Sequence, residues 1–285
     1  MTTVASELDL AGYLDRVRYG GSTDPTLETL QGVVAAHNRS IPFETLDPVT
    51  GVPVADLGPA ALTNKLVHRR RGGYCYEHNG LMGYVLEALG YGIERLAGRV
   101  VWMKEPDAPL PAMTHTVLSV TIPDVAGPFL VDVGFGGQTL TSPIRLEAGL
   151  VQSTRHEPYR LVASGSDGTE LTLQANVRDE WQSLYRFTTR PQPRIDLEVG
   201  SWYVSTHPAS HFVTGLTVAL VTDGERRNLR GRNLAIHHLG GGTEKVRFDT
   251  AAQVLDALTE RFGIDLDDLG DPSVLEARVA TVLDT

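Results

Sequence analysis

The sequence predicts an α+β protein with a helical first third, a strand-rich middle and a mixed carboxyl-terminal region. Over the first 90 residues apolar side chains recur at helical spacing, and from about Ile93 the pattern changes to runs rich in Val, Leu and Thr. Helical spacing returns near residue 250. A chain of 285 residues, 41% of them hydrophobic, can bury a large core around these elements.

The helices of the first region have clear start and stop signals. Asp24-Pro25 predicts a capped start with proline in the first turn. Ile41-Pro42 predicts the end, because proline disfavours helical geometry in the residue before it. A second helix is expected from near Cys75 to Gly90. The apolar face of the first helix carries Leu27, Leu30, Val33, Val34 and His37.

Strand signals fill the middle of the chain, with a Gly-Ser-Asp-Gly turn at 165–168 between two of them. They predict an antiparallel barrel or sandwich. Arg190-Pro-Gln-Pro-Arg194 is the best boundary candidate, followed by a strand-like stretch at 212–221 and two helices. The first helix opens with a Thr250…Gln253 capping box and closes at Phe262-Gly263. The middle strands are expected at 95–102, 115–122, 129–133, 159–161, 169–177 and 181–188.

Composition argues against several classes of protein. A formal charge of −10, from 25 Lys and Arg against 35 Asp and Glu, argues against broad nucleic-acid binding. The first ten residues lack the basic and apolar segments of a signal peptide, and no apolar run approaches the roughly 20 residues of a membrane span. One cysteine makes neither an internal disulfide nor a multi-cysteine zinc site. We expect a globular cytoplasmic protein with no nucleic-acid or membrane partner.

The single cysteine, Cys75, stands in the segment Arg71-Gly-Gly-Tyr-Cys-Tyr-Glu-His-Asn-Gly80. A lone cysteine is usually a small buried apolar residue. Here two glycines permit a tight turn, and a helix is expected to begin at or beside the cysteine. Because a helix N-terminus carries partial positive charge, it lowers the pKa of a thiol and favours the nucleophilic thiolate. The context therefore predicts a reactive cysteine.

Two later residues complete a catalytic arrangement with Cys75. His115 opens a predicted strand, and Asp132 interrupts an apolar one, where a carboxylate is costly unless it is paired. Alone, each has an ordinary alternative, a satisfied or exposed histidine and a turn aspartate. Together the three supply a nucleophile, a base and a group that orients the base. Their order and placement match papain-like and transglutaminase-like sites.

Four other motifs have simpler interpretations. Gly134-Phe-Gly-Gly137 lacks the third glycine of a dinucleotide fingerprint, so a turn or a close ligand approach is expected. Gly240-Gly241-Gly242 indicates a hairpin or loop. His237-His238 point to opposite faces if extended, so no metal site is predicted. Arg69-Arg70-Arg71 indicates a solvated helix end rather than the alternative of an anion contact, with Arg71 anchoring the cysteine turn.

At the cysteine motif the sequence resembles the arylamine N-acetyltransferases, especially the bacterial ones. The resemblance extends over almost the whole chain, and the cysteine motif is highly specific in combination with the two later triad segments. The matching segments are Tyr13-Leu-Asp-Arg-Val-Arg-Tyr19, Ile41-Pro-Phe-Glu44, Thr114-His115-Thr116, Val131-Asp-Val-Gly-Phe-Gly136 and Ser205-Thr-His-Pro-Ala-Ser-His-Phe212. Thr45 departs from the family, which commonly has Asn after Ile-Pro-Phe-Glu.

The resemblance implies three regions: a helical bundle at 1–90, a β-barrel at 91–194 and an α/β lid at 195–285. It implies a ping-pong reaction with acetyl-CoA as co-substrate, no metal, and an arylamine, arylhydrazine or hydrazide as acceptor. By similarity Phe43, Phe135 and Phe212 line the acceptor pocket. By similarity Trp102, Gly134 and Phe212 border the CoA channel. The sequence leaves open whether the protein is a monomer or a small homo-oligomer.

Two alternatives come from other classes. The same triad could serve an amidohydrolase or a transglutaminase-like enzyme, which would release the acyl group to water or lysine. A binding module with an inert Cys75 is the other. CoA dependence distinguishes the first alternative, and thiol reactivity distinguishes the second.

Overall fold

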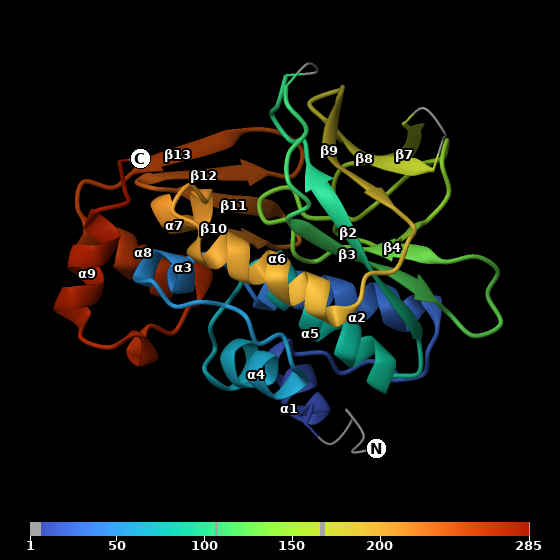
Figure 1. The fold of residues 1–285 in the computed structure, drawn as a ribbon, viewed down its shortest axis with the longest axis horizontal. Coiled ribbons are helices and arrows are strands. Elements are labelled where there is room, and N and C mark those ends of the chain that lie inside the picture. The colour runs from blue at the N-terminus through green and yellow to red at the C-terminus, as the bar shows by residue number, and fades with distance from the viewer. Residues whose placement is uncertain (1–6, 106–107, 166–168, 285) are drawn as a thin grey trace.

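The computed structural model describes residues 7–105, 108–165 and 169–284 (Figure 1). Its first helices are α1 (Leu10–Arg16), α2 (Leu27–Ser40), α3 (Leu46–Thr50), α4 (Pro59–Thr63) and α5 (Cys75–Ala88), and a π-helical turn at Asn64–His68 follows α4. The start predicted for α2 at Asp24-Pro25 is wrong by two residues, because Thr26 caps the helix through the Thr29 N–H at 3.2 Å. The predicted end is confirmed, since Ile41 is extended.

The middle of the chain forms a nearly closed antiparallel barrel, as predicted. Its strand order is β5-β4-β3-β2-β9-β8-β7-β6, and the Gln152 side chain bonds both backbone groups of Arg145 at 2.7 and 3.0 Å between the two outermost strands. The two-residue strands β5 and β6 were not predicted, because so short a segment has no period. The strands are β2 (Gly92–Val100), β3 (His115–Thr121), β4 (Phe129–Val131), β5 (Ile144–Arg145), β6 (Val151–Gln152), β7 (Tyr159–Ser164), β8 (Glu170–Val177) and β9 (Glu180–Thr188). The predicted turn at 165–168 lies mostly outside the described residues.

A second sheet, of order β1-β10-β11-β12-β13, joins the two ends of the chain. Strand β1 (Phe43–Glu44) comes from the helical region and pairs with β10 (Thr217–Val221). The sheet continues through β11 (Glu225–Arg230), β12 (Asn233–His238) and β13 (Thr243–Arg247), and α8 (Ala251–Phe262) and α9 (Pro272–Ala280) pack on its apolar face. The hairpin predicted at 240–242 is confirmed between β12 and β13. The division at residues 90 and 194 stays a prediction.

Two helices lie where none was predicted. Helix α6 (Arg194–Thr206) runs across the face of the molecule in front of α5, and α7 (His211–Thr214) follows it (Figure 1). The strand predicted from 212 is therefore wrong in its first half. Helix α6 exposes Ile195, Val199 and Trp202, so its apolar residues do not mark one buried face, and β-branched and aromatic residues are weak helix formers.

These elements place the site where α5 packs against the barrel. The N-terminus of α5, the first residue of β3 and the end of β4 meet there. Among the described residues, no helix combines the length and the apolar character needed to cross a bilayer.

Candidate active site

Cys75 is the first residue of α5, as its sequence predicts. The preceding residue, Tyr74, is extended, and its N–H donates to Glu77 Oε2 at 3.1 Å, so a side chain of the first turn satisfies this amide. The two preceding glycines are required by space: a Cβ on Gly72 would lie 2.0 Å from the Pro42 carbonyl oxygen. The thiol is 3% exposed and lies 3.6 Å from the Thr114 carbonyl oxygen. The tight turn therefore delivers a buried sulfur to a helix N-terminus.

His115 and Asp132 form a buried pair on adjacent strands. Strand β3 begins with His115, and Asp132 directly follows β4, which pairs with β3. The distance from His115 Nε2 to Asp132 Oδ2 is 2.8 Å, and the two residues are 2% and 1% exposed. Because the carboxylate accepts, Nε2 carries a proton, and Nδ1 is left for the neighbouring thiol of Cys75.

The electrostatics of the pair favour its charged form. Burial disfavours an imidazolium, but the Asp132 carboxylate and the Cys75 thiol outweigh it and raise the pKa of His115 to about 10. Burial likewise disfavours a carboxylate, but His115, Asn79 and the Gly134 N–H hold the pKa of Asp132 below its usual range. The histidine is therefore poised to exist as an imidazolium beside the sulfur.

Asn79 is a site residue that the sequence argument missed. Its Nδ2 donates to Asp132 Oδ1 at 2.9 Å and to the Thr116 carbonyl at 2.7 Å, and its Oδ1 accepts the Val133 N–H at 3.0 Å. It is fully buried, one turn after Cys75 on α5. The four-residue spacing from the nucleophile was the only available signal. Asn79 ties α5, which begins with Cys75, to the part of β3 next to His115 and to the segment after β4 next to Asp132.

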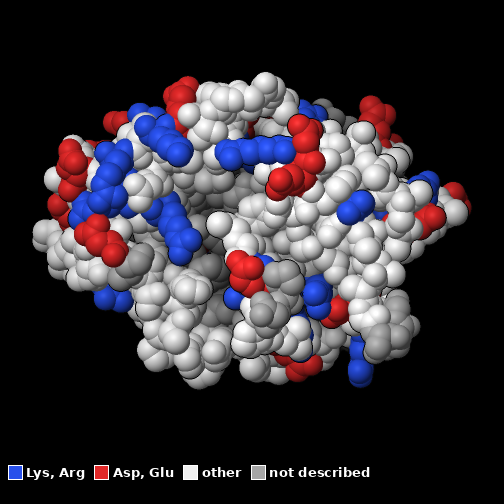
Figure 2. Space-filling view, turned by 90° about the horizontal axis from the view of Figure 1, so that it is seen from above, with Lys and Arg blue, Asp and Glu red and all other residues white. Residues whose placement is uncertain are grey.

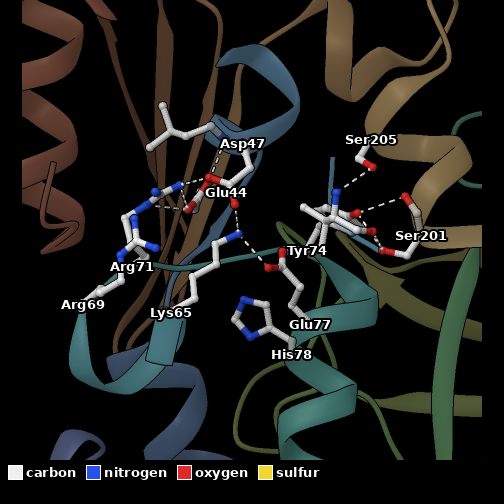
Figure 3. A network of polar contacts seen from close by, with 12 residues as sticks. Glu44, Asp47, Lys65, Arg69, Arg71, Tyr74, Glu77, His78, Ser201 and Ser205 are labelled. Atoms are coloured by element: carbon white, nitrogen blue, oxygen red, sulfur yellow. Dashed lines mark hydrogen bonds and ion pairs between the residues drawn. The ribbon is translucent and has the colours of Figure 1, made fainter. Parts of the chain in front are cut away.

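A buried cluster of charges supports the cysteine turn (Figure 3). Arg71 binds Glu44 at 2.7 Å and Asp47 at 2.8 Å, which confirms the predicted anchoring role, whereas Arg69 and Arg70 are exposed. Lys65 binds Asp47 at 2.7 Å and Glu77 at 2.6 Å. Three carboxyl groups thus share two cations. Burial, with the charges of Asp47 and Glu44, raises the pKa of Glu77 to about 7, even though Lys65 opposes the shift.

The aromatic residues expected in the pocket fall into two groups. Phe43 and Phe212 meet edge to face with 5.9 Å between ring centroids, and the centroids of Phe212 and Tyr74 are 5.3 Å apart. The ring centroids of Phe135 and His115 are 5.3 Å apart. Phe135 packs against the barrel core, and so does Trp102. The structure therefore brings aromatic rings to the histidine and to the turn before the nucleophile.

The structure also places the glycine segment at 134–137 and Thr45. Gly134 approaches Cys75 so closely that a Cβ would lie 2.7 Å from the cysteine Cα, and Gly136 has φ +84°, as a turn requires. Thr45 accepts the Thr217 N–H at 3.1 Å and so bonds to the start of β10. Among the described residues, no group of three His, Cys, Asp or Glu side chains could hold a metal ion.

A thiol at a helix start beside a buried histidine–carboxylate pair, carried on a helical region and a barrel, defines the class of Cys-His-Asp acyl-transfer folds. Residues 26–270 match the N-acetyltransferase family model. An arylamine N-acetyltransferase of Mycolicibacterium smegmatis is 70% identical over 98% of this chain and 99% of its own. An arylamine N-acetyltransferase / N-hydroxyarylamine O-acetyltransferase of Salmonella typhimurium is 36% identical over 96% and 95%. A solved structure of Mycobacterium marinum arylamine N-acetyltransferase in complex with CoA superimposes with a TM-score of 0.93 at 62% identity, covering 96% of this chain and 99% of that one. The chain belongs to the arylamine N-acetyltransferase family.

Proposed function

We propose that this chain transfers an acetyl group from acetyl-CoA to an arylamine, an arylhydrazine or a hydrazide through an acyl-cysteine on Cys75. The observation that carries the proposal is the buried thiol at the start of α5, beside the buried and hydrogen-bonded His115–Asp132 pair. Family membership supports the donor and the acceptor class, since the M. marinum relative binds CoA and the relatives are named for arylamines.

In the first half-reaction, His115 holds the thiol proton on Nδ1 as an imidazolium, and the paired Cys75 thiolate attacks the thioester carbonyl. A bond forms between Cys75 Sγ and the acyl carbon. The bond from that carbon to the CoA sulfur breaks, and the imidazolium returns its proton to the departing CoA thiolate. Asp132 keeps Nε2 protonated and stabilises the charged ring without taking the proton.

In the second half-reaction, the amine nitrogen attacks the same carbonyl carbon. His115 takes a proton from the nitrogen, the carbon–sulfur bond breaks, and Cys75 leaves as a thiolate paired with the imidazolium. The enzyme returns to its starting state. In this proposal Phe43, Phe135 and Phe212 hold a flat acceptor, since aromatic rings favour offset or edge contacts with one another. Trp102, Gly134 and Phe212 border the path of the CoA arm.

A local cationic face resolves the difficulty of an acidic protein that binds an anionic donor. Arg230 on β11 and Lys245 and Arg247 on β13 lie on one face of the second sheet, and all three are exposed. Burial lowers the pKa of His237 on the same face, and so do the charges of Arg178, Arg226 and Lys245, so this ring adds no positive charge near pH 7. Figure 2 shows Lys and Arg side chains gathered beside a hollow on the side of the carboxyl-terminal sheet. We place the CoA phosphates on this face, where several cations converge.

We also propose that the protein works in the cytoplasm, since a reducing compartment keeps a free thiol such as Cys75 active. We propose that it acts as a monomer or a small homo-oligomer. The acidic charge of −10 supports the absence of a nucleic-acid partner. We expect no membrane partner.

The decisive experiment mixes the protein with acetyl-CoA in the absence of an amine. Intact-protein mass spectrometry after a brief interval should show one acetyl adduct on the peptide that contains Cys75, and Cys75→Ser should show none. Double-reciprocal plots of initial rate against one substrate, at several fixed concentrations of the other, should give parallel lines. Rapid CoA release that no amine accelerates would support the hydrolase alternative. Transfer with intersecting lines and no trapped adduct would remove Cys75 as the carrier.

A further inference from the structure

A chain of buried polar side chains runs from α1 through α2 to α5 and ends on a backbone carbonyl. Tyr13 OH lies 3.0 Å from His37 Nδ1, and His37 Nε2 lies 2.8 Å from His78 Nδ1. His78 Nε2 in turn lies 3.1 Å from the Pro42 carbonyl oxygen. All three side chains are fully buried. Neither histidine belongs to the Cys75–His115–Asp132 arrangement.

The direction of this chain is fixed by its last acceptor. The Pro42 carbonyl can only accept, so His78 Nε2 donates to it and His78 Nδ1 accepts from His37 Nε2. His37 Nδ1 then accepts from the hydroxyl of Tyr13. This pattern requires neutral rings. Burial lowers the pKa of both histidines, to about 4 for His78, so neutral rings are the expected state near pH 7.

The chain ends where two functional segments meet. The Pro42 carbonyl also accepts the Gly73 N–H at 3.4 Å, within the turn that leads to Cys75. The next residue, Phe43, stacks on the His78 ring with 6.4 Å between centroids and 13° between planes. Phe43 also meets the Phe212 ring edge to face. His78 therefore touches the Pro42–Phe43 unit twice, once at its carbonyl and once at its ring.

An apolar residue could fill the space of His78, but it could not fix the orientation of a peptide group. A hydrogen bond to the Pro42 carbonyl sets the plane from which Phe43 projects, and the Nε2 donor of His37 holds His78 in the tautomer that makes this bond. We propose that His78 is a positioning residue that sets the place of the Phe43 ring and thereby the selectivity among aromatic acceptors. This inference rests on the proposed function, in which Phe43 lines the acceptor pocket.

The test separates the two half-reactions in the full-length protein. His78→Leu removes the bond and the ring, whereas His78→Gln keeps an Nε2 donor that can reach the Pro42 carbonyl. Tyr13→Phe is the matched control, because it removes one hydroxyl at the far end and leaves the His78–Pro42 bond in place. Acylation is measured as the burst of CoA release, and deacylation as kcat/KM for a one-ring and a two-ring arylamine.

We expect His78→Leu to change the ratio of the two kcat/KM values about tenfold, equivalent to about 1.4 kcal/mol in relative transition-state stabilisation. Acylation should stay within about twofold of wild type, His78→Gln should recover part of the wild-type ratio, and Tyr13→Phe should leave the ratio unchanged. An unchanged ratio in folded His78→Leu, or equal losses in both half-reactions, would overturn the inference.

Misfolding of His78→Leu and inactivity of the wild-type protein have separate consequences. If His78→Leu fails to fold, His37→Leu removes the donor to His78 Nδ1 and should shift the ratio in the same direction, and an unchanged ratio there would also overturn the inference. A wild-type protein that transfers no acetyl group would instead contradict the proposed function, whatever the variants do.

Discussion

Asn79→Ala tests the idea that Asn79 holds Asp132 and the nucleophile's helix together. The substitution removes three buried hydrogen bonds, to Asp132 Oδ1, the Thr116 carbonyl and the Val133 N–H. Two neutral bonds contribute roughly 0.5–1.5 kcal/mol each and the bond to a carboxylate roughly 1.5–3 kcal/mol. The loss in unfolding free energy should therefore be about 2.5–6 kcal/mol. For a chain of this size that lowers Tm by roughly 10 °C.

The expected effect on activity is smaller than the loss of the triad itself. The His115–Asp132 bond uses the other carboxylate oxygen, and the Gly134 N–H still donates to Oδ1 at 3.0 Å. We expect kcat/KM to fall about tenfold to a hundredfold, as a small displacement of a reacting group does. Initial rates of CoA release with an arylamine, together with thermal melts, measure both effects.

Asn38→Ala is the matched control, because Asn38 is also buried but its side chain bonds, within the described part of the chain, only the Leu140 carbonyl, at 3.1 Å through Nδ2. Asn79→Asp is the sharper chemical probe, since it replaces the donor to Asp132 with a second carboxyl. One of the two must then bind a proton, so the activity of this variant relative to wild type should rise as pH falls from 8 to 6. Folded Asn79→Ala with the Tm and kcat/KM of Asn38→Ala would refute the reasoning.

Three further predictions concern the thiol, the charge cluster and the pocket. Iodoacetamide should alkylate Cys75 in the folded protein at neutral pH faster than it alkylates free cysteine, and a rate equal to that of free cysteine would contradict this. Asp132→Asn should slow both alkylation and turnover by orders of magnitude while thermal melts confirm folding. Because the folded pKa of Glu77 is about 7 against 4.5 in an ordinary carboxyl, its contribution to stability is full below pH 4.5 and is lost as pH rises through 7. In denaturant titrations, the unfolding free energy of Glu77→Gln should therefore increase relative to that of wild type as the pH rises from 5 to 8. The substitution Glu94→Gln, at an exposed position, should lack this effect. Phe212→Ala should change selectivity among arylamines more than it slows acylation of Cys75, and equal losses would assign the ring to CoA or to support of the fold.

Local sequence signals were sufficient for the elements that carry the nucleophile and its partners. The glycine pair before Cys75 is required because a Cβ at Gly72 has no room, and the start of α5 follows from that turn. The aspartate that interrupts an apolar strand is buried against His115, as the cost of an unpaired buried carboxylate predicts. These features depend on neighbours in the chain or on a charged residue within an apolar segment, and both are visible in a single sequence.

Other features depend on partners far away in the sequence. Lys65, Asp47 and Glu77 look like ordinary surface residues until the fold buries them together, and Asn79 resembles any polar residue on a helix until β4 brings Asp132 to it. Helix α6 has apolar residues on its exposed side, so its period gave no signal. The sequence by itself determined the turn, the helix start and the chemical types of the site. The tertiary structure alone decided which of these charges and hydrogen-bonding groups share the interior, because burial strengthens interactions that would be weak between exposed groups, here between partners 12 to 53 residues apart in the chain.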